Sequence, residues 1–288
     1  MRKIFLLIML FSTFCTAKAQ LLWEISGKGA KKSYIFGTNH LASSDFLDSV
    51  PNIFKAYNSC QVVVGEILMS AKNISDTIMA YAAMPKEITL NDLLTEEEFV
   101  EIDNALQNTL YLSLKDVATL KPSMISAMYV QAVYEKIFKK DEDFQLDTYF
   151  QHVAEMSGKK VIPLESATEQ AKLLFDNQTL ERQKEILLAT IQDSAKLAQD
   201  IKNIVSLYKS GNLNLLYSEY INDTSKTALT LQEKHDFLDN RNIKWAKKIA
   251  KIIKNNSAFI AVGALHLPSE NGLIALLKKA GYKVKKTT

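Results

Sequence analysis

Apolar runs with the length of β-strands gather near the two ends of this chain, and the long stretch between them has the periodicity of helices. The end runs are residues 21–26, 33–36, 62–64, 259–262 and 282–285. One more run, residues 161–164, interrupts the helical stretch of 71–256, and its Pro163 favours an edge strand. Because strands must pair, the end groups are expected to share one sheet. We predict an α/β fold with α+β character, in which a large helical insertion separates the N-terminal and C-terminal strands of a central mixed sheet.

Local signals divide the helical stretch into separate helices. Thr95 and Glu98 have the spacing of a capping box, and so does a second pair, Ser166 with Glu169. Pro122 suits the first turn of a helix. Long helices are predicted over 179–211 and 227–254.

The N-terminal residues have the pattern of a secretory signal peptide. Arg2 and Lys3 precede an apolar stretch, residues 4–14, and the Ala-Lys-Ala sequence of residues 17–19 has the form of a cleavage site. We predict cleavage between Ala19 and Gln20, export to the periplasm or the extracellular space, and a single mature domain over residues 20–288.

Cleavage would leave a mature chain without net charge. The full chain has 35 Lys and Arg residues against 32 Asp and Glu residues, and residues 1–19 hold three bases and no acid. A neutral chain has no general field that would draw it to nucleic acid, so no nucleic-acid partner is expected. No later apolar stretch is long enough for a bilayer, so no membrane span is expected in the mature chain.

A short pattern occurs twice, near the two ends of the chain. Gly37-Thr38-Asn39-His40 follows one apolar run, and Gly263-Ala264-Leu265-His266 follows another. Ligands of open α/β sheets bind beyond the carboxyl ends of strands, where a glycine lets the backbone turn and a ligand approach. A neutral imidazole there binds a metal ion or transfers a proton. Since both histidines come after the apolar run, both are expected to lie outside the core.

Two carboxylates follow other apolar runs in the same way. Glu66 comes after the run of 62–64, and Glu165 comes after the run of 161–164. Each residue taken alone is more simply explained as a solvated or capped strand end, but four such residues at one edge indicate a site. Two histidines with one or two carboxylates suit a divalent transition metal, and they serve equally as a metal-free acid–base cluster.

An arginine and an asparagine add to this set. Arg241 lies between Phe237 and Trp245 at steps of four residues, and Asn242 lies between Leu238 and Trp245. Helical geometry therefore directs both side chains inward. A buried arginine needs an anionic partner, which would be either a structural ion pair or a clamped substrate or catalytic carboxylate.

The ordered set of motifs resembles the TraB/GumN family, which is related to the Tiki proteins and more distantly to the ChaN and erythromycin-esterase-like folds. The resemblance covers nearly the whole mature chain. Its residues are Leu22-Trp23-Glu24-Ile25, Gly37 to Leu41, Glu66, Lys121-Pro122, Leu146-Asp147 with Tyr149, Gly158-Lys159, Val161 to Glu165, Arg241-Asn242, Val262 to Leu267 and Gly272-Leu273. The chain departs from the family pattern at Pro163, where glycine is more usual, and at Asp239, where glutamate is more usual.

The resemblance implies a metal-dependent hydrolase site built from the two histidines and the glutamate, since Tiki-type members are metal-dependent proteases. On this basis His40, Glu66 and His266 are expected to hold a divalent ion, with manganese, cobalt or zinc as candidates. The residues expected to line the binding site are Gly37, Asn39, Asp147 and Gly263.

We therefore predict an exported metal-dependent hydrolase that acts on a peptide or a small-molecule substrate. Glu66 or Glu165 would act as general base, and Arg241 with Asn242 would stabilise the developing negative charge. The alternatives are a haem- or metal-binding protein without turnover and a metal-free acid–base hydrolase of the erythromycin-esterase-like kind.

Overall fold

The computed structural model describes residues 20–40, 42–138 and 145–287, so the predicted signal peptide lies outside the described residues. Within these ranges the strands form one six-stranded sheet with the order β4-β3-β5-β2-β1-β6. The strands are β1 (Leu22–Ser26), β2 (Ser33–Thr38), β3 (Val62–Gly65), β4 (Lys160–Pro163), β5 (Ala258–Gly263) and β6 (Lys283–Lys286). Strands β4, β3, β5 and β2 are parallel, and β1 pairs antiparallel with both β2 and β6.

This sheet confirms the α/β fold that the sequence predicts. The central strand β5 comes from the C-terminal end of the chain, and it pairs with β2 and β3 from the N-terminal end. The helical stretch is therefore an insertion between strands of one sheet. The β-branched run of β3 is buried along its whole length. Strand β4, which contains Pro163, lies at one edge, because proline has no backbone N–H for a second partner strand.

Most of the remaining elements are helices, and the capping signals mark where some of them begin. The side chains of Thr95 and Ser166 accept hydrogen bonds from the backbone N–H groups of Glu98 and Glu169, and Pro122 lies in the first turn of its helix. The helices are α1 (Ile53–Asn58), α2 (Ile74–Ala82), α3 (Glu96–Leu110), α4 (Leu114–Val117), α5 (Pro122–Ile137), α6 (Leu146–Met156), α7 (Ala167–Phe175), α8 (Leu180–Gln192), α9 (Ser194–Ser210), α10 (Leu213–Asn222), α11 (Leu231–Lys234), α12 (Asn240–Asn255) and α13 (Leu273–Lys279). The shorter turns are η1 (Ser44–Ser49), η2 (Leu90–Leu93) and η4 (Ala264–His266), which are 3₁₀ turns, and η3 (His235–Asp239), which is π-helical. In the parts of the chain that the structure describes, no helix is both long and apolar enough to cross a bilayer.

Both of the predicted long helices are wrong in detail. The segment 179–211 is divided into α8 and α9, because the side chain of Asp193 accepts a hydrogen bond from the N–H of Lys196 and starts a new helix. The segment 227–254 begins later, at Leu231, and passes through the π-helical turn η3 before α12. Such a turn places an extra residue in the helix, and hydrophobic periodicity alone does not reveal it.

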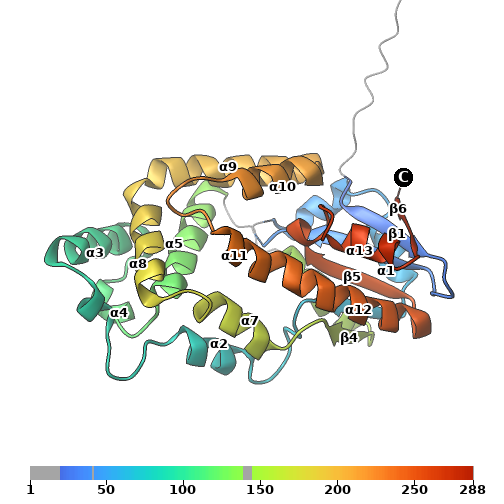
Figure 1. Cartoon of the computed structure of the whole chain (residues 1–288), viewed down its shortest axis with the longest axis horizontal. Coiled ribbons are helices and arrows are strands. Elements are labelled where there is room, and N and C mark those ends of the chain that lie inside the picture. The colour runs from blue at the N-terminus through green and yellow to red at the C-terminus, as the bar shows by residue number, and fades with distance from the viewer. Residues whose placement is uncertain (1–19, 41, 139–144, 288) are drawn as a thin grey trace, which may run out of the picture.

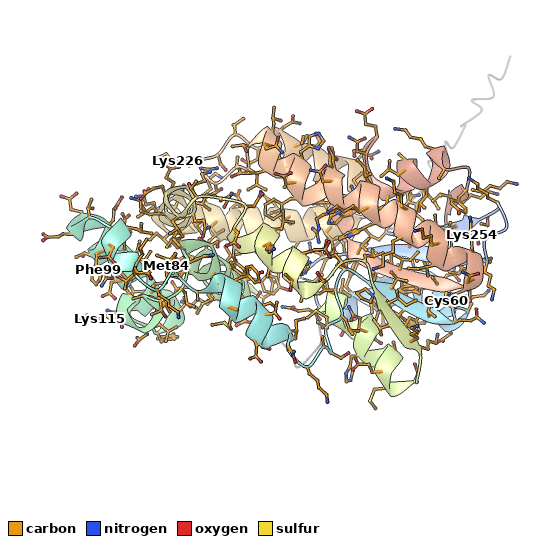
Figure 2. The ribbon with its side chains drawn as sticks, turned by 60° about the horizontal axis from the view of Figure 1, so that its bottom comes forward. Cys60, Met84, Phe99, Lys115, Lys226 and Lys254 are labelled. Carbon is orange, nitrogen blue, oxygen red and sulfur yellow. The ribbon has the colours of Figure 1, made fainter. Side chains whose placement is uncertain are left out.

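The molecule has a sheet part and a helical part (Figure 1). Helices α12 and α13 lie in front of the sheet, α3, α4, α5 and α8 gather at the other end, and β5 runs toward that end. Cys60 and Lys254 mark the sheet end, and Phe99 and Lys115 mark the opposite end (Figure 2). Each part has its own apolar core; Phe36, Phe150 and Phe259 pack in the first, and Leu106, Ile125 and Leu187 in the second.

Replacing Val63 by alanine is expected to lower the free energy of unfolding by about 2 kcal/mol. Val63 is fully buried in β3, so the change removes apolar contacts and leaves a cavity in the sheet core. Urea unfolding would measure the loss. Val100→Ala is the matched control, because Val100 is 57% exposed on α3. Equal effects at the two positions would contradict the placement of β3 at the centre of the core.

Candidate functional site

Four neighbouring strands end at the edge of the sheet that faces the helical part (Figure 1). Thr38 of β2 pairs with Gly263 of β5, and Gly65 of β3 pairs with Pro163 of β4. Because these strands are parallel, the residues that follow them come to the same edge. Those residues are His40, Glu66, Glu165 and His266.

Arg241, in the first turn of α12, holds the two carboxylates together. Its Nη2 donates to Glu66 Oε2 at 2.7 Å and to Glu165 Oε1 at 2.7 Å, and its Nε donates to Glu165 Oε2 at 3.2 Å. The guanidinium carbon lies 4.4 Å from the ring centroid of Trp245, one turn further along the helix. Only 13% of the Arg241 side chain is exposed, so the inward orientation predicted from the helical spacing agrees with the structure. The anionic partners of this arginine are carboxylates of the chain itself.

His266 is held in one orientation by Asn242. The Nδ2 group of Asn242 donates to the Asn271 carbonyl at 3.0 Å, so its Oδ1 is the acceptor for the N–H at His266 Nδ1, 2.7 Å away. Because Nδ1 carries the proton, Nε2 has a lone pair. This Nε2 nitrogen lies 3.2 Å from Arg241 Nη1 and 3.9 Å from Glu66 Oε1. His266 is 4% exposed, so the expectation that it lies outside the core is wrong. The cause is η4, which turns the ring back onto Trp245.

Burial and charge set the protonation of this cluster. Burial, which is the largest cause, and the charges of Arg241 and His40 together lower the pKa of His266 to about 3, against the opposing effect of Glu66. Burial alone would raise the pKa of Glu66, but nearby positive charge, including that of Arg241, and the Gly263 N–H lower it to about 2. For Glu165, burial outweighs Arg241 and raises the pKa. The site therefore combines a neutral imidazole, an ionised Glu66 and a carboxyl group that binds its proton more readily.

His40 belongs to a second pair at the same edge. Its Nδ1 lies 2.6 Å from Asp147 Oδ2 in the first turn of α6, and the hydroxyl of Thr38 donates to the other oxygen of Asp147. The charge of Asp147 raises the pKa of His40 to about 9, with a smaller contribution from Glu66. The side chain of His40 is 72% exposed. At neutral pH this histidine is a cation at the solvent side of the edge, outside the core as expected.

Asp147→Asn is expected to lower the pKa of His40 from about 9 toward its ordinary value of 6.5. The reason is that the charge of Asp147 is the main cause of the shift, and asparagine removes the charge while keeping the shape. A ¹H–¹⁵N NMR titration of the ring nitrogens would measure the change. Asp45→Asn, in η1, is the control. In the wild type the pair adds stability below pH 6.5, and this contribution disappears as the pH rises through about 9.

The predicted lining residues have different surroundings. The N–H of Gly263 donates to Glu66 Oε1 at 2.8 Å, and a Cβ at this position would lie 3.3 Å from that oxygen. At Gly37 a Cβ would lie 2.9 Å from the side chain of Leu267, so this glycine permits close packing behind the site. Asn39 is half-buried in the loop between β2 and His40. Gly263 is therefore the glycine that contributes directly to the cluster.

Two residues of the cluster were missed by the sequence analysis. Gln170 Nε2 lies 3.2 Å from Glu66 Oε2 and 3.4 Å from Glu165 Oε1, so one amide joins both carboxylates. The ring of Trp245 packs against both Arg241 and His266, with centroids 4.5 Å apart in the second pair. Trp245 has the spacing of a core residue, which hides its second role, and no motif marks Gln170.

The donor set fits only part of a metal site. Glu66 and His266 offer an oxygen and a nitrogen 3.9 Å apart, and the Asn242 hydrogen bond is of the kind that orients metal-binding histidines. Across the described ranges, however, no three His, Cys, Asp or Glu side chains are arranged to hold a metal ion. The guanidinium of Arg241 contacts both donors, and His40 pairs with Asp147 instead. As they lie here, the three predicted ligands do not form a metal site.

A cleft with a volume of about 460 Å³ opens beside this cluster. Glu165 and Arg241 form part of its wall, and its sides are lined with charged residues of both signs from α7 and from the η3–α12 region. His266 is not among the lining residues. A molecule in this cleft would therefore meet Arg241 and Glu165 before it reached the imidazole.

The chain is similar over most of its length to metalloproteases of the TIKI type. The metalloprotease TIKI homolog of Amphimedon queenslandica is 23% identical over 91% of this chain and 60% of its own length. Metalloprotease TIKI1 of Danio rerio is 21% identical over 92% of this chain and 63% of its own, and that of Xenopus tropicalis is 22% identical over 91% and 60%. This chain thus spans less than two thirds of the length of these relatives. No solved structure matches the chain.

The family assignment rests on a broader match than these pairwise identities. A model of the TraB/PrgY/gumN family matches residues 21–286, which include all four strand ends and the whole helical insertion. The match confirms the resemblance that the sequence motifs indicate: this chain belongs to the TraB/PrgY/gumN family.

Proposed function

We propose that this chain is an exported hydrolase of the peptidase type, with its reacting centre at His266, Glu66 and Arg241. The observation that carries the proposal is the buried imidazole of His266, whose unprotonated Nε2 lies 3.2 Å from Arg241 Nη1 and 3.9 Å from Glu66 Oε1. This imidazole is unprotonated at neutral pH, so Nε2 has a lone pair that can take a proton during the reaction, and a fixed positive charge lies beside it. The family assignment and the similarity to TIKI metalloproteases support hydrolysis of a peptide bond as the reaction.

In the proposed reaction the Nε2 of His266 removes a proton from a water molecule as its oxygen attacks the scissile carbonyl carbon. On substrate binding, the Nη1 N–H of Arg241 that faces His266 Nε2 turns to the carbonyl oxygen, which gains negative charge, and Nε2 is then open to the water molecule; the other Nη1 N–H stays on the Phe237 carbonyl. When the carbon–nitrogen bond breaks, the imidazolium returns the proton to the leaving amine. The ionised Glu66 stabilises the imidazolium between these two steps, and Glu165 holds Arg241 in place.

The sequence predicts Glu66 or Glu165 as general base and Asn242 as a group that stabilises the developing negative charge. The proposed reaction differs on both points. Both oxygens of Glu66 already accept hydrogen bonds, Oε1 from the Gly263 N–H and Oε2 from Arg241, so we assign the proton transfer to His266. Asn242 orients the ring and does not reach the carbonyl oxygen in this scheme. The cleft beside Arg241 carries charges of both signs, which suits a peptide with polar side chains.

Metal dependence stays a prediction from the sequence, and no step above depends on it. A peptide library incubated with the purified protein, with cleavage followed by mass spectrometry, tests the function. All samples would first be treated with a chelator. One would then stay without metal, and the others would receive manganese, cobalt or zinc. Cleavage after chelation would support the metal-free scheme. Cleavage that returns only with a metal would support metal-dependent hydrolysis and contradict the metal-free scheme.

The same assay separates an enzyme from a binding protein. Absence of cleavage in every sample, in a protein that is folded by circular dichroism, would reject the peptidase and leave a hydrolase of small molecules or a haem- or metal-binding role. Glu66→Gln is the matched variant, because it keeps the shape of the side chain while removing the charge that faces His266.

Export is expected to remove residues 1–19 and leave Gln20 as the first residue. The basic and apolar pattern of the first residues and the Ala-Lys-Ala sequence before Gln20 support this part of the proposal. Mass spectrometry of the secreted or periplasmic protein would read the N-terminus directly. Ala19→Arg is the test variant, since a bulky charged residue at the cleavage site should leave the full-length chain uncut.

A further inference from the structure

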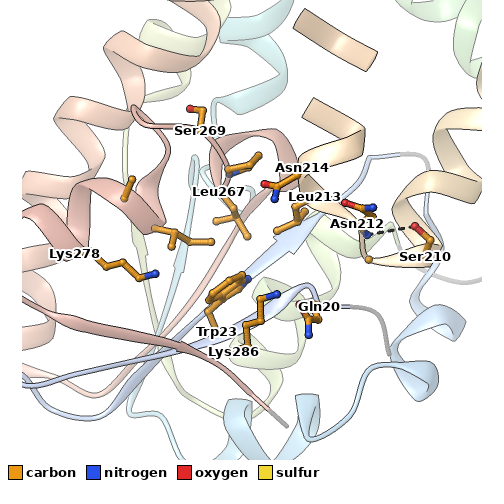
Figure 3. A pocket seen from close by; sticks show the side chains of 14 residues that line it. Gln20, Trp23, Ser210, Asn212, Leu213, Asn214, Leu267, Ser269, Lys278 and Lys286 are labelled. Atoms are coloured by element: carbon orange, nitrogen blue, oxygen red, sulfur yellow. Dashed lines mark hydrogen bonds between the residues drawn. The ribbon is translucent and has the colours of Figure 1, made fainter. Parts of the chain in front are cut away.

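A second cavity lies apart from the reacting centre, on the other side of the loop that follows His266. Its volume is about 470 Å³, which is within the range of small-molecule sites. Its walls come from β1, the start of α10, the loop after η4, α13 and β6. Trp23 lies in the middle of the lining side chains, with Lys286 beside it and Leu267 and Lys278 around it (Figure 3).

The charges around this cavity all have one sign. Lys278 and Lys286 are the charged residues of its lining, and no aspartate or glutamate is among them. Their ammonium groups lie 5.9 Å and 5.4 Å from the ring centroid of Trp23. Neither ammonium group forms an ion pair or hydrogen bond with any residue that the structure describes. Two cations close to one aromatic ring, with no carboxylate among the described lining residues, favour a ligand with a negative charge.

The uncharged groups of the lining limit the ligand further. The Oδ1 of Asn212 accepts the N–H of Leu215 at 3.1 Å and caps α10, so the amide NH₂ is the part of this side chain that is left for a ligand. The ring of Trp23 and the side chains of Leu267 and Ile274 form an apolar surface. The cavity thus combines an amide donor and two positive charges with an apolar surface.

We propose that this cavity binds a small amphipathic carboxylate. The carboxylate lies between Lys278 and Lys286, and its aromatic or aliphatic body lies on Trp23 and Ile274. The proposal does not depend on the hydrolase reaction, since none of the cavity residues contributes to the cluster around Arg241.

Isothermal titration calorimetry with phenylbutyrate as the probe tests the proposal. Phenylbutyrate has an aromatic body and one carboxylate, and phenylbutyramide is the uncharged match in size and shape. The wild type is expected to bind the acid at least about tenfold more tightly than the amide, because only the acid pairs with the lysines. Raising the ionic strength should weaken binding of the acid and leave that of the amide unchanged.

The double variant Lys278→Gln/Lys286→Gln is expected to lose about tenfold or more in affinity for the acid. Lys251→Gln/Lys254→Gln on α12 removes the same charge from exposed positions outside the cavity, and it should bind like the wild type. His266→Asn should also bind like the wild type, so failure of hydrolysis and failure of this site are distinguishable. Equal binding of acid and amide, equal affinity in the two double variants, or no heat of binding in the wild type would overturn the proposal.

Discussion

Replacing His266 by asparagine is expected to lower the rate of peptide hydrolysis by about 10²–10⁴-fold, which is the usual contribution of a general base. The asparagine amide nitrogen takes the place of Nδ1, so the hydrogen bond to Asn242 Oδ1, 2.7 Å in the wild type, is kept. The group that is lost is Nε2, the nitrogen that faces Arg241 and Glu66. The measurement is kcat on a cleaved peptide, together with the melting temperature.

His152→Asn is the matched control, because His152 is exposed on α6, away from the cluster. Alanine at position 266 would be a poorer test. His266 is buried against Trp245, so alanine would leave a cavity and an unpaired Asn242 oxygen, and it would lower stability as well as rate. If His266→Asn keeps the full rate, the imidazole is structural and the proposed mechanism fails.

Arg241→Ala is expected to destabilise the protein by about 3–5 kcal/mol at neutral pH. The change leaves the carboxylates of Glu66 and Glu165 without their shared cation, and these side chains are only 12% and 9% exposed. It also removes the packing of the guanidinium on Trp245. Urea unfolding would measure the loss, with Lys251→Ala, at an exposed position of the same helix, as control.

The pH dependence of this loss gives a second test. In the wild type the pKa of Glu66 is lowered from 4.5 to about 2, so its ionisation stabilises the fold above pH 4.5, and this contribution disappears as the pH falls toward 2. Without Arg241 the burial of both carboxylates raises their pKa values, and the penalty is largest at high pH. The difference in stability between wild type and variant should therefore shrink as the pH is lowered. A difference that does not change with pH would show that lost packing, and not unpaired charge, is the cause.

The sequence predicts the sheet well because its strands have strong local signals. Continuous β-branched or apolar runs such as 62–64 and 259–262 end at glycines, and the structure has β3 and β5 at these places. The break at Asp193 and the π-helical turn η3 were missed. The break at Asp193 depends on one side chain that caps the start of α9, and the π-helical turn depends on how the helix packs. Neither feature changes the apolar periodicity over a long window of residues.

For the site, the sequence predicts which residues come to the edge of the sheet but not which of them contact one another. The spacing of Arg241 in its helix and the position of four residues after strands lead to residues that the structure brings to one edge. The sequence does not tell which of them touch, and the partner of His40 is Asp147 on α6, a residue more than one hundred positions away in the chain. It also does not show that η4 turns His266 back into the core, because that depends on the packing of Trp245 and Gly37.

The order of strands in the sheet has a consequence for biosynthesis. Strands β2 and β3 lie on either side of β5, and β5 begins only at Ala258. While the ribosome makes the intervening segment, the inner edges of both N-terminal strands stay unpaired, and exposed edges of this kind promote aggregation. The sheet part therefore cannot fold during translation, and pairing between such distant segments is slow. In a nascent chain with this topology, the edges of β2 and β3 that will pair with β5 stay open until residues 258–263 have emerged.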